Sequence, residues 1–197
     1  MPTEIPLKCR CGAMTGVATN VKELYRIVCY CRWCQAYAKH LGREDELLDA
    51  QQGTHVYQFA PSQIRLLTGQ EHLRCLRLTA KGAMRFHAQC CQTPIANTVE
   101  QAWVPWLGMP HLFLDGEREP GFGPVRYRVH GRHAKDPHPA AHPKGSASLV
   151  LKTLAGMSLD YLRGNAWPSP FFDRASKKPV VDPRILRDDE RAAIGLR

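Results

Sequence analysis

Residues 29–34 read CYCRWC and place three cysteines, Cys29, Cys31 and Cys34, within six positions. Thiolates this close in the chain converge on one point, which suits zinc or another thiophilic ion in tetrahedral coordination. No neighbouring residue supplies an obvious fourth ligand. Two interpretations follow: an open zinc site whose fourth position takes water or a substrate thiol, and a closed structural site completed by a residue distant in the sequence.

Four more cysteines form two further clusters. Cys9 and Cys11 flank a single residue, and the glycine that follows them gives the backbone the freedom to turn N–H groups towards sulfur. Cys90 and Cys91 are adjacent, and because neighbouring side chains usually diverge, we expect one of them to be a ligand and the other its neighbour. His87, a few residues upstream, is the alternative ligand.

Composition limits the classes of protein to consider. The chain has 197 residues and a net charge of +9, with no long apolar run and no basic segment leading into one. We therefore expect a cytoplasmic protein without a membrane span, whose cysteines are reduced and available to metal rather than paired in disulfides. The charge favours an anionic partner, but the basic residues are scattered, which argues against nucleic acid. Cys75 stands alone and is predicted to be a small buried apolar residue.

Short segments rich in Val, Ile, Thr and aromatic residues predict β-strands along the first half of the chain. These segments are residues 14–20, 25–30, 54–59, 64–68, 72–78, 84–88 and 95–99. Their close spacing predicts a small, mainly β structure that is largely antiparallel.

Helical patterns are fewer. Residues 34–41 predict a helix, because Gly42 after them is a good helix stop. This helix would begin at Cys34, so the positive end of its dipole would lie at the thiolates of residues 29–34. Residues 147–163 carry leucines at helical spacing up to Gly164 and predict an amphipathic packing helix.

Two regions have no regular pattern. Residues 129–145 are rich in His, Pro and Gly and predict a long surface loop. The segment after Gly164 is rich in proline but contains Trp167, Phe171 and Phe172, so we expect it to dock on its own domain or on a second copy of the chain in a homodimer.

The order of these motifs, CxCG, then CYCxxC before a short helix, then CCQTP, resembles the glutathione-dependent formaldehyde-activating enzyme family, which includes the centromere protein V relatives. The resemblance covers residues 6–115 and implies an Mss4-like fold, a complex β structure stitched by zinc, with a few short helices and an extended C-terminal tail. Together with the patterns described above, we expect residues 1–128 to form the zinc-binding domain, 129–146 a His/Pro-rich loop, 147–164 a packing helix, and 165–197 a docked or partly ordered tail.

The resemblance also implies two zinc sites. Cys9, Cys11 and Cys91 fall on the family's structural site. The chain departs from the family pattern here, because the first cysteine and the glycine of the family's CxxCG turn are replaced by alanine and glutamine. The structural site then needs Cys90 or His87 as its fourth ligand, and we favour Cys90 because it preserves a four-sulfur site.

The second, labile site of the family meets the glutathione thiol. Here it corresponds to Cys29, Cys31 and Cys34, which would be the catalytic zinc ligands in a carbon–sulfur lyase that condenses glutathione with formaldehyde. Arg32 could pair with glutathione carboxylates and Trp33 could pack on the peptide. Further candidates for these contacts are Arg10, Arg26 and Tyr30. The rival hypotheses are a non-catalytic zinc module that binds a thiol and a module that binds protein or nucleic acid. Asp115 is interpreted as a turn residue.

Overall fold

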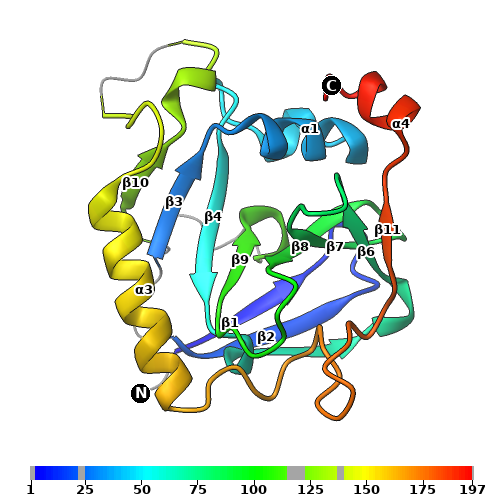
Figure 1. Ribbon diagram of the computed structural model, residues 1–197. Coiled ribbons are helices and arrows are strands. Elements are labelled where there is room, and N and C mark those ends of the chain that lie inside the picture. The colour runs from blue at the N-terminus through cyan, green and yellow to red at the C-terminus, as the bar shows by residue number, and fades with distance from the viewer. Residues whose placement is uncertain (1–2, 22–24, 115–122, 137–139, 197) are drawn as a thin grey trace.

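Two β-sheets organise the part of the chain that the computed structural model describes, which is residues 3–21, 25–114, 123–136 and 140–196 (Figure 1). The strands are β1 (Thr3–Lys8), β2 (Thr15–Val21), β3 (Tyr25–Cys29), β4 (Thr54–Phe59), β5 (Ile64–Thr68), β6 (Leu73–Arg77), β7 (Met84–Ala88), β8 (Thr93–Thr98), β9 (Leu107–Pro110), β10 (Val125–Val129) and β11 (Pro183–Ile185). The mainly β prediction is confirmed. Asp115 and His138 lie outside the described residues.

The smaller sheet has the order β1-β2-β5 and is antiparallel throughout. The larger sheet has the order β10-β3-β4-β9-β8-β7-β6-β11. Its central strands pair antiparallel, and only β6–β7 and β7–β8 are joined by short turns, whereas the two edge strands, β10 beside β3 and β11 beside β6, pair parallel. Both parallel edges come from late segments of the chain that return to the sheet.

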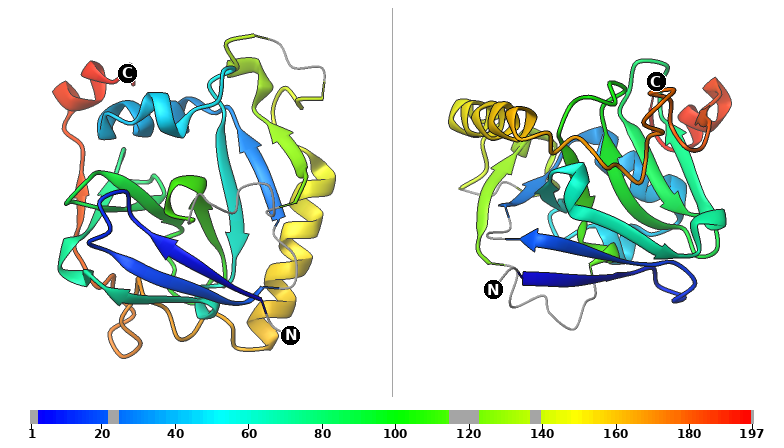
Figure 2. Two further views of the ribbon diagram at one scale, coloured as in Figure 1. Left: turned by 180° about the vertical axis from the view of Figure 1, so that it is seen from behind. Right: turned by 90° about the horizontal axis from the view of Figure 1, so that it is seen from below.

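The helices lie around the larger sheet (Figures 1 and 2). They are α1 (Arg32–Leu41), α2 (Glu44–Leu47), α3 (Ala147–Leu162) and α4 (Asp188–Ala193), with 3-10 turns at Pro61–Gln63, Gln70–His72, His111–Phe113 and Gly131–His133. Helix α1 ends at Gly42 in the left-handed conformation, as the sequence predicts. Its buried residues Tyr37 and Leu41 pack with Leu76 of β6 and Leu186 after β11 in a second, smaller core.

The larger core joins the two sheets and also receives the tail. Met14 before β2, Tyr57 of β4 and Phe86 of β7 are all fully buried in it. Phe171 of the tail packs its ring 4.7 Å from that of Phe86, and Phe172 is buried beside it. These two aromatic residues of the tail thus pack in the core of their own chain.

Helix α3 forms where the sequence predicts it and lies along the β10–β3 side of the sheet (Figure 2). None of its 16 residues is buried, so the helix lacks the buried apolar face that its leucine spacing predicts. Leu151 and Leu162 point outward and are 70% and 81% exposed. No helix in the described ranges is both long and apolar enough to cross a bilayer.

The His/Pro-rich loop folds back on itself after β10. The backbone N–H of His142 donates to the carbonyl oxygen of Arg128 over 2.9 Å, and that of Gly131 donates to His142 over 2.9 Å. These bonds fasten the described part of the loop beside the start of helix α1, where the backbone N–H of Tyr30 also donates to Val129.

Candidate metal centres

The first cluster, the four-cysteine cluster, consists of Cys9, Cys11, Cys90 and Cys91. One pair comes from the turn after β1 and the other from the turn between β7 and β8. All four Sγ atoms lie within 4.8 Å of one another. Cys9 is buried, whereas Cys11 and Cys90 are exposed, so the cluster lies at the surface and joins two turns that are far apart in the sequence.

The spacing of the sulfur atoms fits one tetrahedral ion. The Sγ–Sγ distances are 3.4 Å between Cys11 and Cys90, 3.6 Å between Cys9 and Cys11, 3.8 Å between Cys90 and Cys91, and 3.9 Å between Cys9 and Cys90. A tetrahedron with Zn–S bonds of about 2.3 Å has edges of about 3.8 Å. Both members of the adjacent pair belong to the group, as the four-sulfur site favoured from the resemblance requires, although adjacent side chains usually diverge. His87 is not part of the group.

The turns themselves hold the sulfur atoms in place. The backbone N–H of Met14 donates to Cys9 Sγ over 3.2 Å, while the N–H of Cys9 donates to the Met14 carbonyl oxygen over 3.0 Å. On the other turn, Thr93 Oγ1 lies 3.1 Å from Cys91 Sγ and accepts from the backbone N–H of Arg10 over 3.1 Å. Thr93 therefore ties the two turns together directly at the sulfur atoms.

These contacts separate the acidities of the thiols. Burial raises the pKa of Cys91, but hydrogen bonds from Thr93 and from the backbone of Cys11 outweigh it and lower that pKa to about 6. Burial, followed by the hydrogen bonds with Cys11, Cys91 and Cys9, raises the pKa of Cys90. The lowered pKa favours the thiolate form of Cys91.

Arginines around the four-cysteine cluster are paired with a carboxylate. Glu46 of α2 forms ion pairs with Arg10 and with Arg43, the latter over 2.9 Å. The Nε of Arg43 also donates to the carbonyl oxygen of Cys91 over 3.1 Å. Arg10, a candidate for substrate contact at the other cluster, lies here instead.

The second cluster, the three-cysteine cluster, consists of Cys29, Cys31 and Cys34. Cys29 is the last residue of β3, Cys31 precedes α1 as its N-cap residue, and Cys34 lies in the first turn of α1. Their Sγ atoms also lie within 4.8 Å of one another, with 3.3 Å between Cys31 and Cys34. All three side chains are half-buried at the corner where the strand becomes the helix.

The three thiols of this cluster differ in their pKa values. Hydrogen bonds from Cys29 and then Cys34 lower the pKa of Cys31 to about 2. The pKa of Cys29 is raised well above its usual value by the hydrogen bonds with Cys31 and Cys34 and by burial. For Cys34 the hydrogen bond with Cys29 lowers the pKa, but the bond to Cys31 and burial outweigh it, and the pKa rises to about 12. Cys31 is therefore the first thiolate of this cluster.

The side chain of Gln35 fixes the start of α1. Its Nε2 donates to the carbonyl oxygens of Tyr30 over 3.0 Å and His133 over 2.9 Å, joining the helix to the loop after β10. Arg32 and Trp33 lie on the same turn in exposed positions, and Trp33 is 45% exposed. Both side chains are thus accessible beside the cluster.

Two other candidates for substrate contact have different surroundings. Tyr30 is fully buried, and its hydroxyl accepts a hydrogen bond from Arg128 over 2.8 Å, so it has no surface on which a peptide could pack. Arg26 on β3 donates from Nε to His55 Nδ1 over 3.0 Å and lies 5.7 Å from the centre of the Tyr57 ring.

Two buried polar residues near the three-cysteine cluster were not predicted from the sequence. Thr54 is the register partner of Cys29 across β3 and β4, and its buried Oγ1 has no hydrogen-bond partner within the described part of the chain. Arg85 on β7 is buried, and its charge contributes to lowering the pKa of Cys31. The signal for Arg85 was the alternation in residues 84–88, where a basic residue occupies every second position of a strand.

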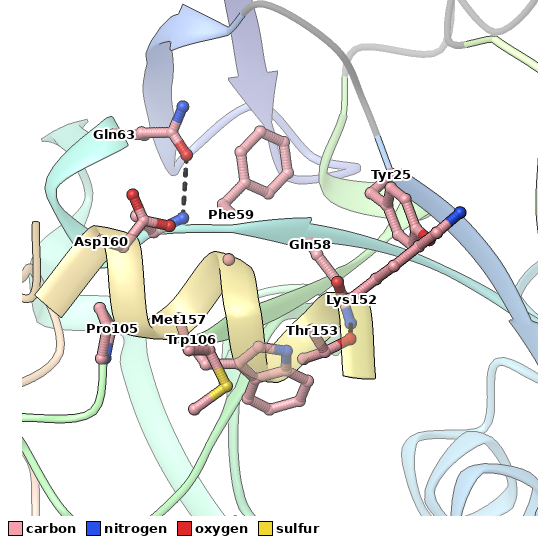
Figure 3. A pocket seen from close by; sticks show the side chains of 12 residues that line it. Tyr25, Gln58, Phe59, Gln63, Pro105, Trp106, Lys152, Thr153, Met157 and Asp160 are labelled. Carbon is pink, nitrogen blue, oxygen red and sulfur yellow. Dashed lines mark hydrogen bonds between the residues drawn. The ribbon is translucent and has the colours of Figure 1, made fainter. Parts of the chain in front are cut away.

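A separate hollow of about 310 Å³ lies between α3 and the sheet (Figure 3). Tyr25 lines it at the start of β3, the opposite end of that strand from Cys29, and Lys152 and Asp160 reach it from α3. No cysteine lines it, so this hollow is distinct from both clusters.

Residues 1–183 match the sequence model of DUF6151, which is described as a family of unknown function. The chain belongs to this family. No curated protein matches the chain. Among solved structures, it is similar to a crystal structure of a Rhodobacter sphaeroides protein, with 16% identity over 61% of this chain and 97% of that one and a TM-score of 0.41.

Proposed function

We propose that this DUF6151 protein binds zinc at both clusters, and that its three-cysteine cluster takes up a small thiol such as glutathione and joins it to formaldehyde or another small aldehyde. The observation that carries the proposal is the convergence of three Sγ atoms at one corner, with no fourth metal ligand grouped with them among the described residues. Three protein ligands and a position left to a small molecule are typical of catalytic zinc sites, whereas four-sulfur sites are structural.

The chemistry of the donor set fits zinc. Cys29, Cys31 and Cys34 would hold the ion, and Cys31 is the thiolate that binds first. Zinc held there would lower the pKa of a thiol at its fourth position and leave that thiol nucleophilic.

The proposed reaction is balanced without an oxidant or a reductant. The thiol sulfur forms a bond to the carbonyl carbon of the aldehyde, the π electrons of the C=O bond move to its oxygen, and that oxygen takes up the proton released by the thiol. The product is a hemithioacetal, which carries an S-hydroxymethyl group when the aldehyde is formaldehyde. The protein would bind the substrate thiol beside the three cysteine sulfur atoms and orient it towards the aldehyde.

The exposed side chains on the first turn of α1 suit a charged peptide thiol. Arg32 can pair with a carboxylate of glutathione, and Trp33 offers an aromatic face beside it. The net charge of +9 favours the approach of an anionic substrate.

A feature of the four-cysteine cluster supports the resemblance from which the activity is proposed. Gln92 occupies the position of the family's turn glycine and has a φ of 56°, in the left-handed region that glycine favours. The turn therefore keeps the backbone conformation that a glycine would allow, even though the residue has changed.

The test measures the exchange between free formaldehyde and its glutathione adduct by NMR, with zinc-loaded protein and without it. We expect the protein to accelerate exchange above the spontaneous rate, and Cys31→Ser to remove the acceleration. A spontaneous rate in the presence of protein that binds glutathione would instead identify a non-catalytic thiol-binding module. Acceleration that persisted in Cys31→Ser protein lacking the second zinc would also contradict the proposal.

A further inference from the structure

Arg85 is a buried positive charge with no carboxylate beside it in the described part of the chain. It lies on β7 and is 7% exposed. Its Nη1 donates to Asn97 Oδ1 over 3.2 Å, and its guanidinium carbon lies 4.9 Å from the centre of the Tyr37 ring. Arg77 on the neighbouring strand is similarly buried but forms an ion pair with Glu100 over 3.2 Å. A buried charge is costly unless an opposite charge compensates it, so the environment of Arg85 calls for an anion.

The position of Arg85 indicates which anion that is. Tyr37, on which its guanidinium stacks, lies three residues after Cys34 on α1, and residues three apart share one face of a helix. Arg85 therefore lies under the first turns of α1, close to the three-cysteine cluster. The pKa of Cys31 is lowered first by its hydrogen bonds with Cys29 and Cys34, and the charge of Arg85 acts in the same direction.

The net charge of a metal ion bound by the three cysteines explains why a nearby arginine would matter. Three thiolates around a divalent ion carry one net negative charge, and a fourth thiolate raises this to two. The four-cysteine cluster reaches the same charge but lies at the surface, where water solvates it. The three-cysteine cluster is half-buried and has less access to water, so a fixed positive charge beneath it has a larger effect.

We propose that Arg85 is a positioning residue that supplies the counter-charge for a metal ion at Cys29, Cys31 and Cys34, and so allows the centre to accept a fourth ligand that is an anionic thiolate. This inference rests on the proposed function. Asn97 holds the guanidinium from β8, and Tyr37 covers its face, so the charge is fixed before a ligand arrives. Preorganised charge of this kind stabilises an anion at little reorganisation cost.

The experiment uses the full chain loaded with Co²⁺, whose thiolate bands report the number of sulfur ligands. 2-Mercaptoethanol is the probe, because it has no carboxylate and thus reports only the charge at sulfur. We expect Arg85→Met to weaken Co²⁺ binding at the three-cysteine cluster, and uptake of the thiol there, by about 10- to 100-fold, as loss of a residue supporting metal ligands does elsewhere. Arg85→Lys should recover most of both.

Arg77→Met is the matched control, because it removes a buried arginine from the adjacent strand that has its own carboxylate partner. It should leave thiol uptake unchanged. Co²⁺ bound at the four-cysteine cluster reports whether each variant folds, and Arg85→Gln replaces Arg85→Met if the latter does not fold.

Two results would overturn the role of Arg85 alone: thiol uptake in the folded neutral variant equal to that of wild type, or an equal loss in Arg77→Met. If Co²⁺-loaded wild type took up no thiol, the proposed function would fail and this inference would fail with it.

Discussion

The two cysteine clusters differ in how far apart in the chain their ligands lie. The four-cysteine cluster joins residues 9–11 to residues 90–91, whereas the three-cysteine cluster lies within residues 29–34. A metal ion that bridges distant segments restricts the unfolded chain strongly, while one held by six consecutive residues restricts it little. We therefore expect metal at the four-cysteine cluster to stabilise the fold more than metal at the three-cysteine cluster.

The largest expected effect comes from breaking the long-range cluster. Cys90→Ser should remove its zinc and lower the free energy of unfolding by several kcal/mol, because metal binding at a structural site is coupled to folding. Thermal unfolding with and without a chelator measures the loss. A Cys90→Ser protein as stable as wild type, and equally indifferent to chelator, would show that this cluster does not stabilise the fold.

The buried histidine His87 should make the stability of the fold depend on pH. His87 lies on β7 between Arg85 and the Cys90 turn, and burial lowers its pKa to about 4 from an unperturbed value of about 6.5. Because the unfolded chain binds the proton more readily, stability is complete above pH 6.5 and falls between about pH 6.5 and 4, by up to about 3 kcal/mol.

His87→Gln removes this histidine from the titration. Since acid also protonates the thiolates of both clusters, the histidine's contribution is the difference between wild type and His87→Gln in unfolding experiments across that pH range. Parallel curves for the two proteins would contradict it.

Cys75 separates burial from metal binding. It is 3% exposed in the larger core and belongs to neither cluster. Cys75→Ala should cost about 1 kcal/mol of stability through lost packing and leave the zinc content unchanged. Denaturant unfolding together with zinc analysis measures both, and a drop in zinc would assign this cysteine to a metal site.

The smallest effect on stability should come from the local cluster. Cys34→Ser should lower the free energy of unfolding by less than about 1 kcal/mol, because metal there closes only a short loop. Denaturant midpoints of wild type and the variant check this. A loss as large as that of Cys90→Ser would make the second cluster structural as well, which is the closed-site interpretation of the sequence.

Much of the fold was readable from local patterns. The predicted strands at residues 54–59, 64–68 and 84–88 coincide with β4, β5 and β7. Strand β1 was missed because Pro6 interrupts its pattern, and proline is tolerated there because β1 is an edge strand. Strand β11 has only three residues and exists because it pairs with β6, a contact with no local signal.

In the candidate sites, too, residues close in the sequence could be predicted and contacts between distant residues could not. Spacing alone identified Cys29, Cys31 and Cys34, because they are close in sequence. The joint participation of Cys90 and Cys91 depends on how the turn before β8 presents them to the other turn, which spacing does not specify. Arg85 was missed for a similar reason, since a strand and a helix about 50 residues apart meet only in the tertiary structure.

The most direct test of this comparison is the zinc content per chain, by elemental analysis of protein purified under reducing conditions, for wild type and Cys31→Ser. We expect about two zinc ions in wild type and about one in the variant, which should remain folded. One zinc ion in both proteins would contradict it, because the three-cysteine cluster would then hold no metal of its own.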